Sequence, residues 1–221
     1  MKKIIAGIIA GAIIVCAALF MLNGLKNQSE DDTFIRAFHD EFGDGSISYI
    51  TLDRKDGLTY NDLHIGVDYY SDDTKKLWKM IKWLEEHIFH SVGTRFDSVE
   101  YVHVYLTYND IANDIRFSNC WLTTDKKMET PSDKRLDHLK IIFYNGTMED
   151  MRAFSDCREI LVDKIDNLGT DADFSAFKEL EYLEIYYLAD SRYIDDGSPL
   201  PPGIIGKIQS TLPEGCVFEH A

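Results

Sequence analysis

The apolar residues between Met151 and Leu188 follow one spacing twice, and the two copies lie 23 residues apart. Each copy advances in steps of three residues, typical of a helical or 3₁₀ turn, and then takes a step of two, typical of a strand. We therefore predict two units, each a turn of helix followed by a short strand. A fixed period of this length favours an array in which each unit buries its apolar face against its neighbours. The repeated positions are Met151, Phe154, Cys157, Ile160, Val162 and Ile165, and then Phe174, Phe177, Leu180, Leu183, Ile185 and Leu188.

The strand part of this unit resembles the core of the leucine-rich repeat, which is written L-x-x-L-x-L. Leu180, Leu183 and Ile185 match it, and the same spacing recurs three more times upstream. The family's asparagine is replaced by other residues in this chain, so the resemblance implies an irregular array of short parallel strands over residues 99–190. An ordinary α+β sheet with evenly spaced strands is the alternative. The upstream matches are Cys157, Ile160 and Val162, then Leu136, Leu139 and Ile141, and then Val99, Val102 and Val104.

The patterns on either side of the repeats predict a β-β-α unit before them and a cap after them. Leu77, Ile81 and Leu84 belong to the apolar stripe of an amphipathic helix. If the strands that flank this helix are parallel neighbours, residues 99–108 form the first strand of the array. The predicted elements are a helix over residues 33–42, strands over 47–52 and 63–70, a helix over 73–90, strands over 99–108 and 117–122, a helix over 204–212 and a terminal strand over 216–218.

The N-terminal segment predicts a membrane anchor. Residues 4–22 carry no charge, and a helix of 19–22 residues is about 29–33 Å long, close to the thickness of a bilayer core. Lys2 and Lys3 precede it, so the positive-inside rule places the N-terminus in the cytoplasm and the domain outside. Gly7 and Gly11 are spaced for self-association of two such helices. A signal peptide whose cleavage releases a secreted protein is the alternative.

The predicted fold class is therefore α+β: a single N-terminal transmembrane helix, a β-β-α unit, and an irregular leucine-rich-repeat-like array of short parallel strands. We expect membrane contact through residues 4–25. The predicted domains are an anchor over residues 1–25, a linker over 26–32, the α+β N-terminal part of the outer domain over 33–98, and the leucine-rich-repeat-like part with its C-terminal cap over 99–221.

The charge of the chain narrows the choice of partner. It has 38 acidic and 23 basic residues and a formal net charge of −15. Nucleic-acid-binding proteins present basic surfaces, so we expect no nucleic-acid partner. Solubility alone accounts for such a charge, and attraction of a basic partner is the sharper interpretation.

The predicted strands alternate, so the neighbours of their buried residues face the other side of the sheet. This places Tyr101 level with Tyr182 and Tyr105 level with Tyr186, with two strands between the pairs. We also expect Leu183 to be buried and Glu184 to face solvent. Tyrosine-rich sheet faces are typical of recognition surfaces for a protein or glycan partner, although cross-strand rings also stabilise sheets. The candidate binding residues are Tyr101, His103, Tyr105, Lys140, Tyr182, Glu184 and Tyr186.

The sequence contains no motif for a catalytic nucleophile or a phosphate-binding loop. We therefore expect no enzymatic activity and no cofactor. Carboxylates between the two repeats are candidate calcium ligands, because Ca²⁺ takes oxygen ligands, and a solvated acidic loop is the alternative. These carboxylates belong to Asp163, Asp166, Asp171 and Asp173.

The predicted function is that of a membrane-anchored extracytoplasmic binding protein. One alternative is an acidic inhibitor or immunity-type protein that neutralises a basic partner. The other is an extracytoplasmic enzyme whose site is assembled from residues that are distant in the sequence.

Overall fold

The computed structural model describes residues 30–43, 46–54, 60–69, 74–89, 96, 99–108, 117–124, 135–144, 147–165, 172–189 and 197–221. The chain divides into two compact units, residues 1–44 and residues 45–221. In the first unit, residues 30–42 are helical, and Phe34 and Phe38 are its buried side chains.

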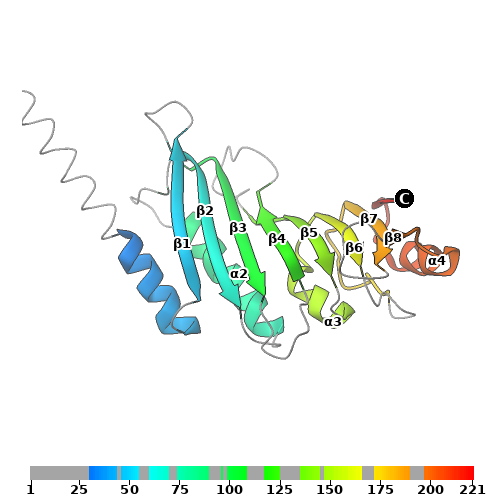
Figure 1. Cartoon of the computed structure of the whole chain (residues 1–221), viewed down its shortest axis with the longest axis horizontal. Coiled ribbons are helices and arrows are strands. Elements are labelled where there is room, and N and C mark those ends of the chain that lie inside the picture. The colour runs from blue at the N-terminus through cyan, green and yellow to red at the C-terminus, as the bar shows by residue number, and fades with distance from the viewer. Residues whose placement is uncertain are drawn as a thin grey trace, which may run out of the picture. The chain divides into compact units, whose positions relative to one another are not determined.

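The described strands of the second unit form one nine-stranded sheet whose order follows the chain from the first strand to the eighth, with the ninth also pairing the seventh (Figure 1). The strands are β1 (Ile47–Arg54), β2 (Tyr60–Tyr69), β3 (Tyr101–Tyr108), β4 (Phe117–Thr123), β5 (His138–Tyr144), β6 (Glu159–Ile165), β7 (Tyr182–Ala189), β8 (Gly197–Ser198) and β9 (Val217–His220). The helices are α2 (Thr74–Phe89), α3 (Met148–Met151), the 3₁₀ turn η3 (Arg152–Phe154) and α4 (Pro202–Thr211).

The sheet is mixed. β1 and β2 form an antiparallel hairpin, and β3 returns parallel to β2 after α2. β4 is antiparallel to both β3 and β5. From β5 onward the strands β5, β6, β7 and β9 are all parallel, and the short β8 pairs antiparallel with the end of β7.

The two repeats pair in the register that their spacing predicts. Ile160 of β6 is opposite Leu183 of β7, which lies 23 residues later, and both side chains are shielded from solvent. Backbone hydrogen bonds fix the start of each parallel strand, because the carbonyl of Asp137 accepts from the amide of Glu159, and the carbonyl of Arg158 accepts from the amide of Tyr182. The short helical turns between the strands provide the crossovers that parallel pairing requires.

The predicted fold class is wrong about the strand over residues 99–108, which was expected to be the first strand of the parallel array. That strand is β3, and it does not begin a parallel array, because the antiparallel β4 lies between it and β5. β4 contributes the buried side chains of Cys120 and Leu122 to the core. It also supplies backbone partners to both neighbours, so neither β3 nor β5 is left with an unpaired edge there.

The prediction of a transmembrane anchor over residues 1–25 is corrected as well. Residues 1–29 lie outside the described residues, and no helix of the described part of the chain has the length and apolar character needed to cross a membrane. Among the described helices the longest is α2, whose 16 residues extend for about 24 Å. The single-pass topology, the membrane localisation and the self-association through Gly7 and Gly11 all depended on that anchor and are corrected with it.

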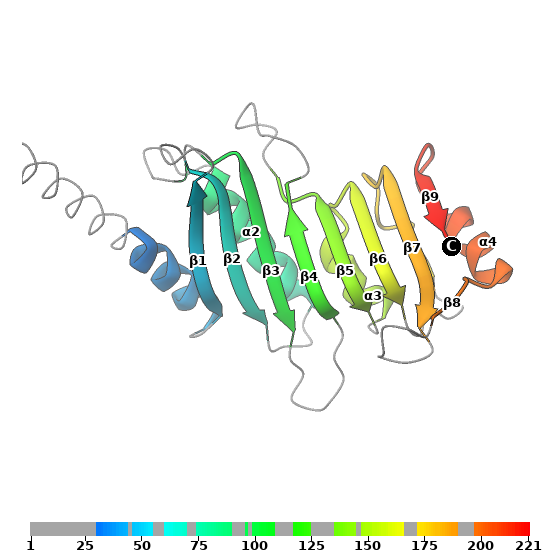
Figure 2. The ribbon, with the colours of Figure 1, turned by 45° about the horizontal axis from the view of Figure 1, so that its top comes forward.

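One face of the sheet is covered by helices. Figures 1 and 2 both show α2 and α3 on the same side of the sheet. Leu77, Ile81 and Leu84 of α2 are buried, as the apolar stripe predicts, and they lie on the side toward which the strands direct their aliphatic residues. None of the described helices α2, α3 and η3 lies on the other face, which we call the open face.

Candidate functional site

The registers of the sheet arrange the side chains of the open face in rows, because residues paired across neighbouring strands point to the same side. Two rows cross the sheet from β1 to β9. The first contains the positions of Thr51, His64, His103, Thr123, His138, Glu159, Tyr182 and Val217. The second contains the positions of Tyr49, Gly66, Tyr105, Trp121, Lys140, Leu161, Glu184 and Glu219.

All seven predicted binding residues are on this face, but they do not form one site. His103, and not Tyr101, is level with Tyr182, so the predicted phasing is wrong by two residues. Three strands separate β3 from β7 instead of two, which puts the two groups of tyrosines about 19 Å apart at ~4.8 Å per strand. Tyr186 is 41% exposed, whereas Tyr101, Tyr105 and Tyr182 are half-buried.

Four residues at the β7–β9 end gather into what we call the acidic tyrosine cluster: Tyr182, Glu184, Tyr186 and Glu219. Glu184 and Glu219 are in register on neighbouring parallel strands. The hydroxyl of Tyr182 lies between them, 3.1 Å from Oε2 of Glu184 and 3.0 Å from Oε2 of Glu219. Glu184 is only 8% exposed, so the prediction that it faces solvent is wrong, and the reason is that Tyr182, Tyr186 and β9 surround it.

Two tyrosine hydroxyls are the side-chain donors that approach the carboxylates of this cluster. A phenol has one proton, so Tyr182 donates to one carboxylate at a time although it lies within hydrogen-bond distance of both. Tyr186 donates to Glu184, and this hydrogen bond, together with the charge of Glu184, raises the pKa of Tyr186. Partial burial and the hydrogen bonds to Glu219 and Glu184 raise the pKa of Tyr182. Within the described residues, no basic side chain forms an ion pair with Glu184 or Glu219.

A second group, which we call the histidine–aspartate cluster, lies at the β1–β3 end and consists of Asp53, Asp62, His64 and His103. The imidazole rings of His64 and His103 stack with their centroids 4.6 Å apart and their planes 11° from parallel. Asp53 Oδ2 is 3.4 Å from His64 Nε2. Burial and the neighbouring His64 lower the pKa of His103 against the opposing effect of the two aspartates.

The middle of the open face separates the two clusters. His138 Nδ1 is 2.8 Å from Glu159 Oε2, and Lys140 is exposed. Lys140 is in the same row as Glu184 but two strands away, which is about 10 Å. Lys140 and Glu184, both among the described residues, form no ion pair with each other.

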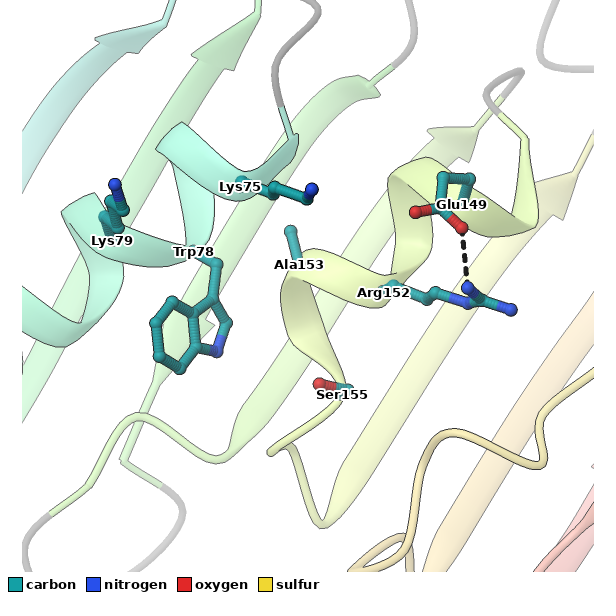
Figure 3. Close-up of a pocket in the computed structure, with 7 residues that line it drawn as sticks. All are labelled: Lys75, Trp78, Lys79, Glu149, Arg152, Ala153 and Ser155. Carbon is teal, nitrogen blue, oxygen red and sulfur yellow. Dashed lines mark ion pairs between the residues drawn. The ribbon is translucent and has the colours of Figure 1, made fainter.

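The helical face carries a pocket of about 360 Å³ between α2 and η3 (Figure 3). Figure 3 shows Lys79 directed away from Ala153, and Arg152 directed toward Glu149, with which it forms an ion pair of 2.7 Å. The indole of Trp78 is 3.3 Å from Asp156 at one side of the pocket. Lys79 thus points out of the pocket and the charge of Arg152 is paired with Glu149, whereas a catalytic pocket directs several polar groups at one point.

The calcium candidate is only partly described. Asp166 and Asp171 lie outside the described residues. Asp163 is on the open face of β6, and Asp173 lies in the connection to β7, where its Oδ1 accepts from the amide of Ser175 at 2.9 Å. Hydrogen bonds from the side chain and backbone of Ser175 lower the pKa of Asp173, which is the ordinary behaviour of an aspartate that caps a turn.

The candidate binding residues predicted from the sequence did not include Glu219 or three members of the histidine–aspartate cluster, namely Asp53, Asp62 and His64. Asp62 and His64 are separated by one residue on a strand, and this alternation was a readable sign that they share a face. Nothing local in the sequence connects Asp53 to them, or Glu219 to Glu184.

Comparison with known proteins gives no further guide. No protein-family model matches the chain, and no curated protein and no solved structure is significantly similar to it. The resemblance to leucine-rich repeats therefore stays a prediction.

Proposed function

We propose that the chain is a binding protein that recognises a basic protein partner, and that its acidic tyrosine cluster receives an arginine or lysine side chain of that partner. The observation that carries the proposal is the pairing of Glu184 with Glu219. Their strands hold them side by side in register, and no basic residue of the described chain neutralises them.

Such a pair is unfavourable in the free protein. Like charges directly opposite each other destabilise a sheet, and partial burial of Glu184 strengthens the repulsion because less water screens it. Local features that reduce stability with no compensation inside the chain are expected mainly at functional sites. A cation placed between the two carboxylates would donate hydrogen bonds to both and remove the repulsion.

An arginine suits this cluster better than a small cation. A guanidinium is planar, presents several N–H donors in a fixed geometry, and binds carboxylates with two parallel hydrogen bonds. It also packs favourably over aromatic rings. Tyr186 offers such a ring beside the carboxylates, since it is 41% exposed and donates to Glu184.

The charge of the whole chain agrees with a basic partner. A net charge of −15 attracts a basic protein at long range and speeds the encounter. An inhibitor that neutralises a basic protein would use the same chemistry, so that alternative differs from the present proposal only in what binding does to the partner. A neutral glycan would gain little from two adjacent carboxylates.

Selection of peptides from a random library tests the proposal while the partner is still unidentified. We expect the full chain to enrich peptides that contain arginine or lysine. These peptides should bind at least tenfold more weakly to the Glu184→Gln/Glu219→Gln variant, because truncating one side of a hydrogen-bonded charge pair costs more than 1.4 kcal/mol, or about tenfold.

The matched control is Glu86→Gln, which makes the same charge change at an exposed position of α2. It should leave the affinity within about twofold. Enrichment of peptides without basic residues, or equal binding to the double variant and the wild type, would contradict the proposal.

A further inference from the structure

The histidine–aspartate cluster lies at the opposite end of the open face and takes no part in the function proposed above. His64 and His103 are in register on the parallel strands β2 and β3. Asp62 lies two residues before His64 and therefore on the same face, and Asp53 of β1 is in register with Asp62. Three adjacent strands thus bring four side chains with metal-binding atoms to one place.

We propose that this cluster is a binding site for a divalent transition-metal ion, with Asp62, His64 and His103 as ligands and Asp53 beside them. The ligand atoms of Asp62, His64 and His103 all lie within 4.8 Å of one another. Bonds of about 2.0–2.2 Å from zinc to nitrogen and oxygen place the ligands of a tetrahedral site about 3.4 Å apart. Asp53, which is not one of the three ligands, lies beside them with its Oδ2 3.4 Å from His64 Nε2. The separations among the three ligand atoms, at most 4.8 Å, exceed that spacing by no more than about 1.4 Å. The rings of His64 and His103 have to rotate out of their stacked arrangement for both nitrogens to point at one ion.

The types of ligand select the class of metal. Imidazole nitrogens suit Zn²⁺, Cu²⁺ and Ni²⁺, whereas Ca²⁺ and Mg²⁺ prefer sites made of oxygen atoms. Two histidines with one or two aspartates are therefore a set for zinc or a similar ion, and unsuited to calcium. Zinc is the ion we use to test the site.

The charges at this end of the sheet also favour a cation. Asp53 and Asp62 oppose each other in register, which is unfavourable unless a positive charge lies close by. Asp62, His64 and His103 are all half-buried, so an ion reaches them from solvent and keeps one coordination position for water or for a side chain of a partner. The inference is independent of the acidic tyrosine cluster, because about 19 Å of sheet separates the two.

Isothermal titration of the full chain with ZnCl₂ tests the site. We expect one high-affinity ion per chain. His64→Asn and His103→Asn should each weaken the affinity at least tenfold, since even the loss of groups that only orient ligands costs 10–100-fold. The control is His138→Asn, which removes a histidine from the same face, beside Glu159, and should leave the affinity unchanged. CaCl₂ should give no comparable binding.

A spectroscopic measurement separates loss of the site from loss of the fold. Co²⁺ bound by four ligands should give intense visible absorption bands in the wild type and in His138→Asn, and not in His103→Asn or in the nearly isosteric Asp62→Asn. Circular dichroism confirms that each variant is folded. Absence of zinc binding by the wild type, or binding that survives both His64→Asn and His103→Asn, would overturn the proposal.

Discussion

Replacing Glu184 by glutamine should make the free protein more stable while it weakens binding. Glutamine keeps the size of the side chain, and its amide supplies a donor that Tyr182 or Glu219 can accept. The change also removes one of two negative charges that no basic residue of the described chain offsets. Most substitutions at a nearly buried position destabilise a protein, so an increase in stability is a discriminating result.

The size of the effect follows from the geometry. Oε2 of Glu184 and Oε2 of Glu219 lie 3.1 and 3.0 Å from the same hydroxyl, so they are at most about 6 Å apart. Two unit charges at ~6 Å repel by ~0.7 kcal/mol in water and by ~2.8 kcal/mol at an effective dielectric constant of ~20. Weaker acceptance of the Tyr186 hydrogen bond offsets part of this, so we expect a net gain of about 1 kcal/mol, or ~2–4 °C in Tm for a chain of this size.

Urea unfolding of Glu184→Gln, Glu219→Gln and the double variant forms a double-mutant cycle. Either single change removes the repulsion, so the double variant should gain no more than one of them, which gives a coupling energy of about 1 kcal/mol. In 1 M salt, where the Debye length is ~3 Å, the gain should fall by about half. Glu86→Gln is the control, with no expected change. Destabilisation by Glu184→Gln, or gains from the two single variants that simply add, would show that Glu184 and Glu219 do not repel each other in the folded protein.

Three further predictions concern the core and the ion pairs. Leu183→Ala should reduce the free energy of unfolding by ~2–5 kcal/mol in urea titrations because Leu183 is fully buried, and a loss below 1 kcal/mol would place it outside the core. Asp137→Ala should cost ~1–3 kcal/mol in the same assay, because the buried carboxylate accepts from Nε and Nη2 of Arg158 at 2.8 and 2.6 Å, and a change within ~0.5 kcal/mol would argue against this. Partial burial raises the pKa of Asp156, but hydrogen bonds, first of all from Lys82, outweigh that effect and lower the pKa below 3.8. The ionised carboxylate therefore stabilises the folded state above pH 3.8, and this contribution is lost as the pH falls through the lower pKa of the folded state. Lys82→Met should therefore lower stability at pH 7 and make it less sensitive to pH between 5 and 2, and an unchanged pH dependence would count against the Lys82–Asp156 pair, whose atoms lie 2.9 Å apart.

The sequence predicted the fold best where a single apolar spacing set both which residues are buried and how two strands align. Ile160 and Leu183 lie 23 residues apart and are opposite each other on β6 and β7. Equivalent positions of two repeats align in this way because both bury the same face of a parallel pair of strands. The amphipathic stripe of α2 was equally readable, since Leu77 and Leu84 recur at the helical period and are buried.

The sequence did not predict which strands pair with each other or in which direction. β4 was predicted as a strand, but nothing in residues 117–122 says that it runs antiparallel between β3 and β5. Its insertion shifted the alignment by two residues, so that His103 and not Tyr101 is level with Tyr182. A shift of two keeps every side chain on its own face, which is why the seven candidate residues still share one face although their arrangement on it and their exposure differ from the prediction.

Both clusters depend on contacts that only the assembled sheet creates. Glu219 reaches Glu184 because β9 pairs in parallel with β7 after the α4 excursion. Asp53 reaches His64 through the hairpin of β1 and β2. The sequence places these residues on strands, but their meeting depends on strand order and register, which a single sequence does not specify.

A map of where a basic peptide binds tests whether the acidic tyrosine cluster is the binding site. A ¹⁵N-labelled sample of the full chain is titrated with a peptide selected for binding, and changes in amide chemical shift are followed along the sequence. We expect the largest changes on β6, β7 and β9, around Asp163, Glu184, Tyr186 and Glu219, and no change on α2. Largest changes at Trp78 and Arg152, on the helical face, would contradict this expectation.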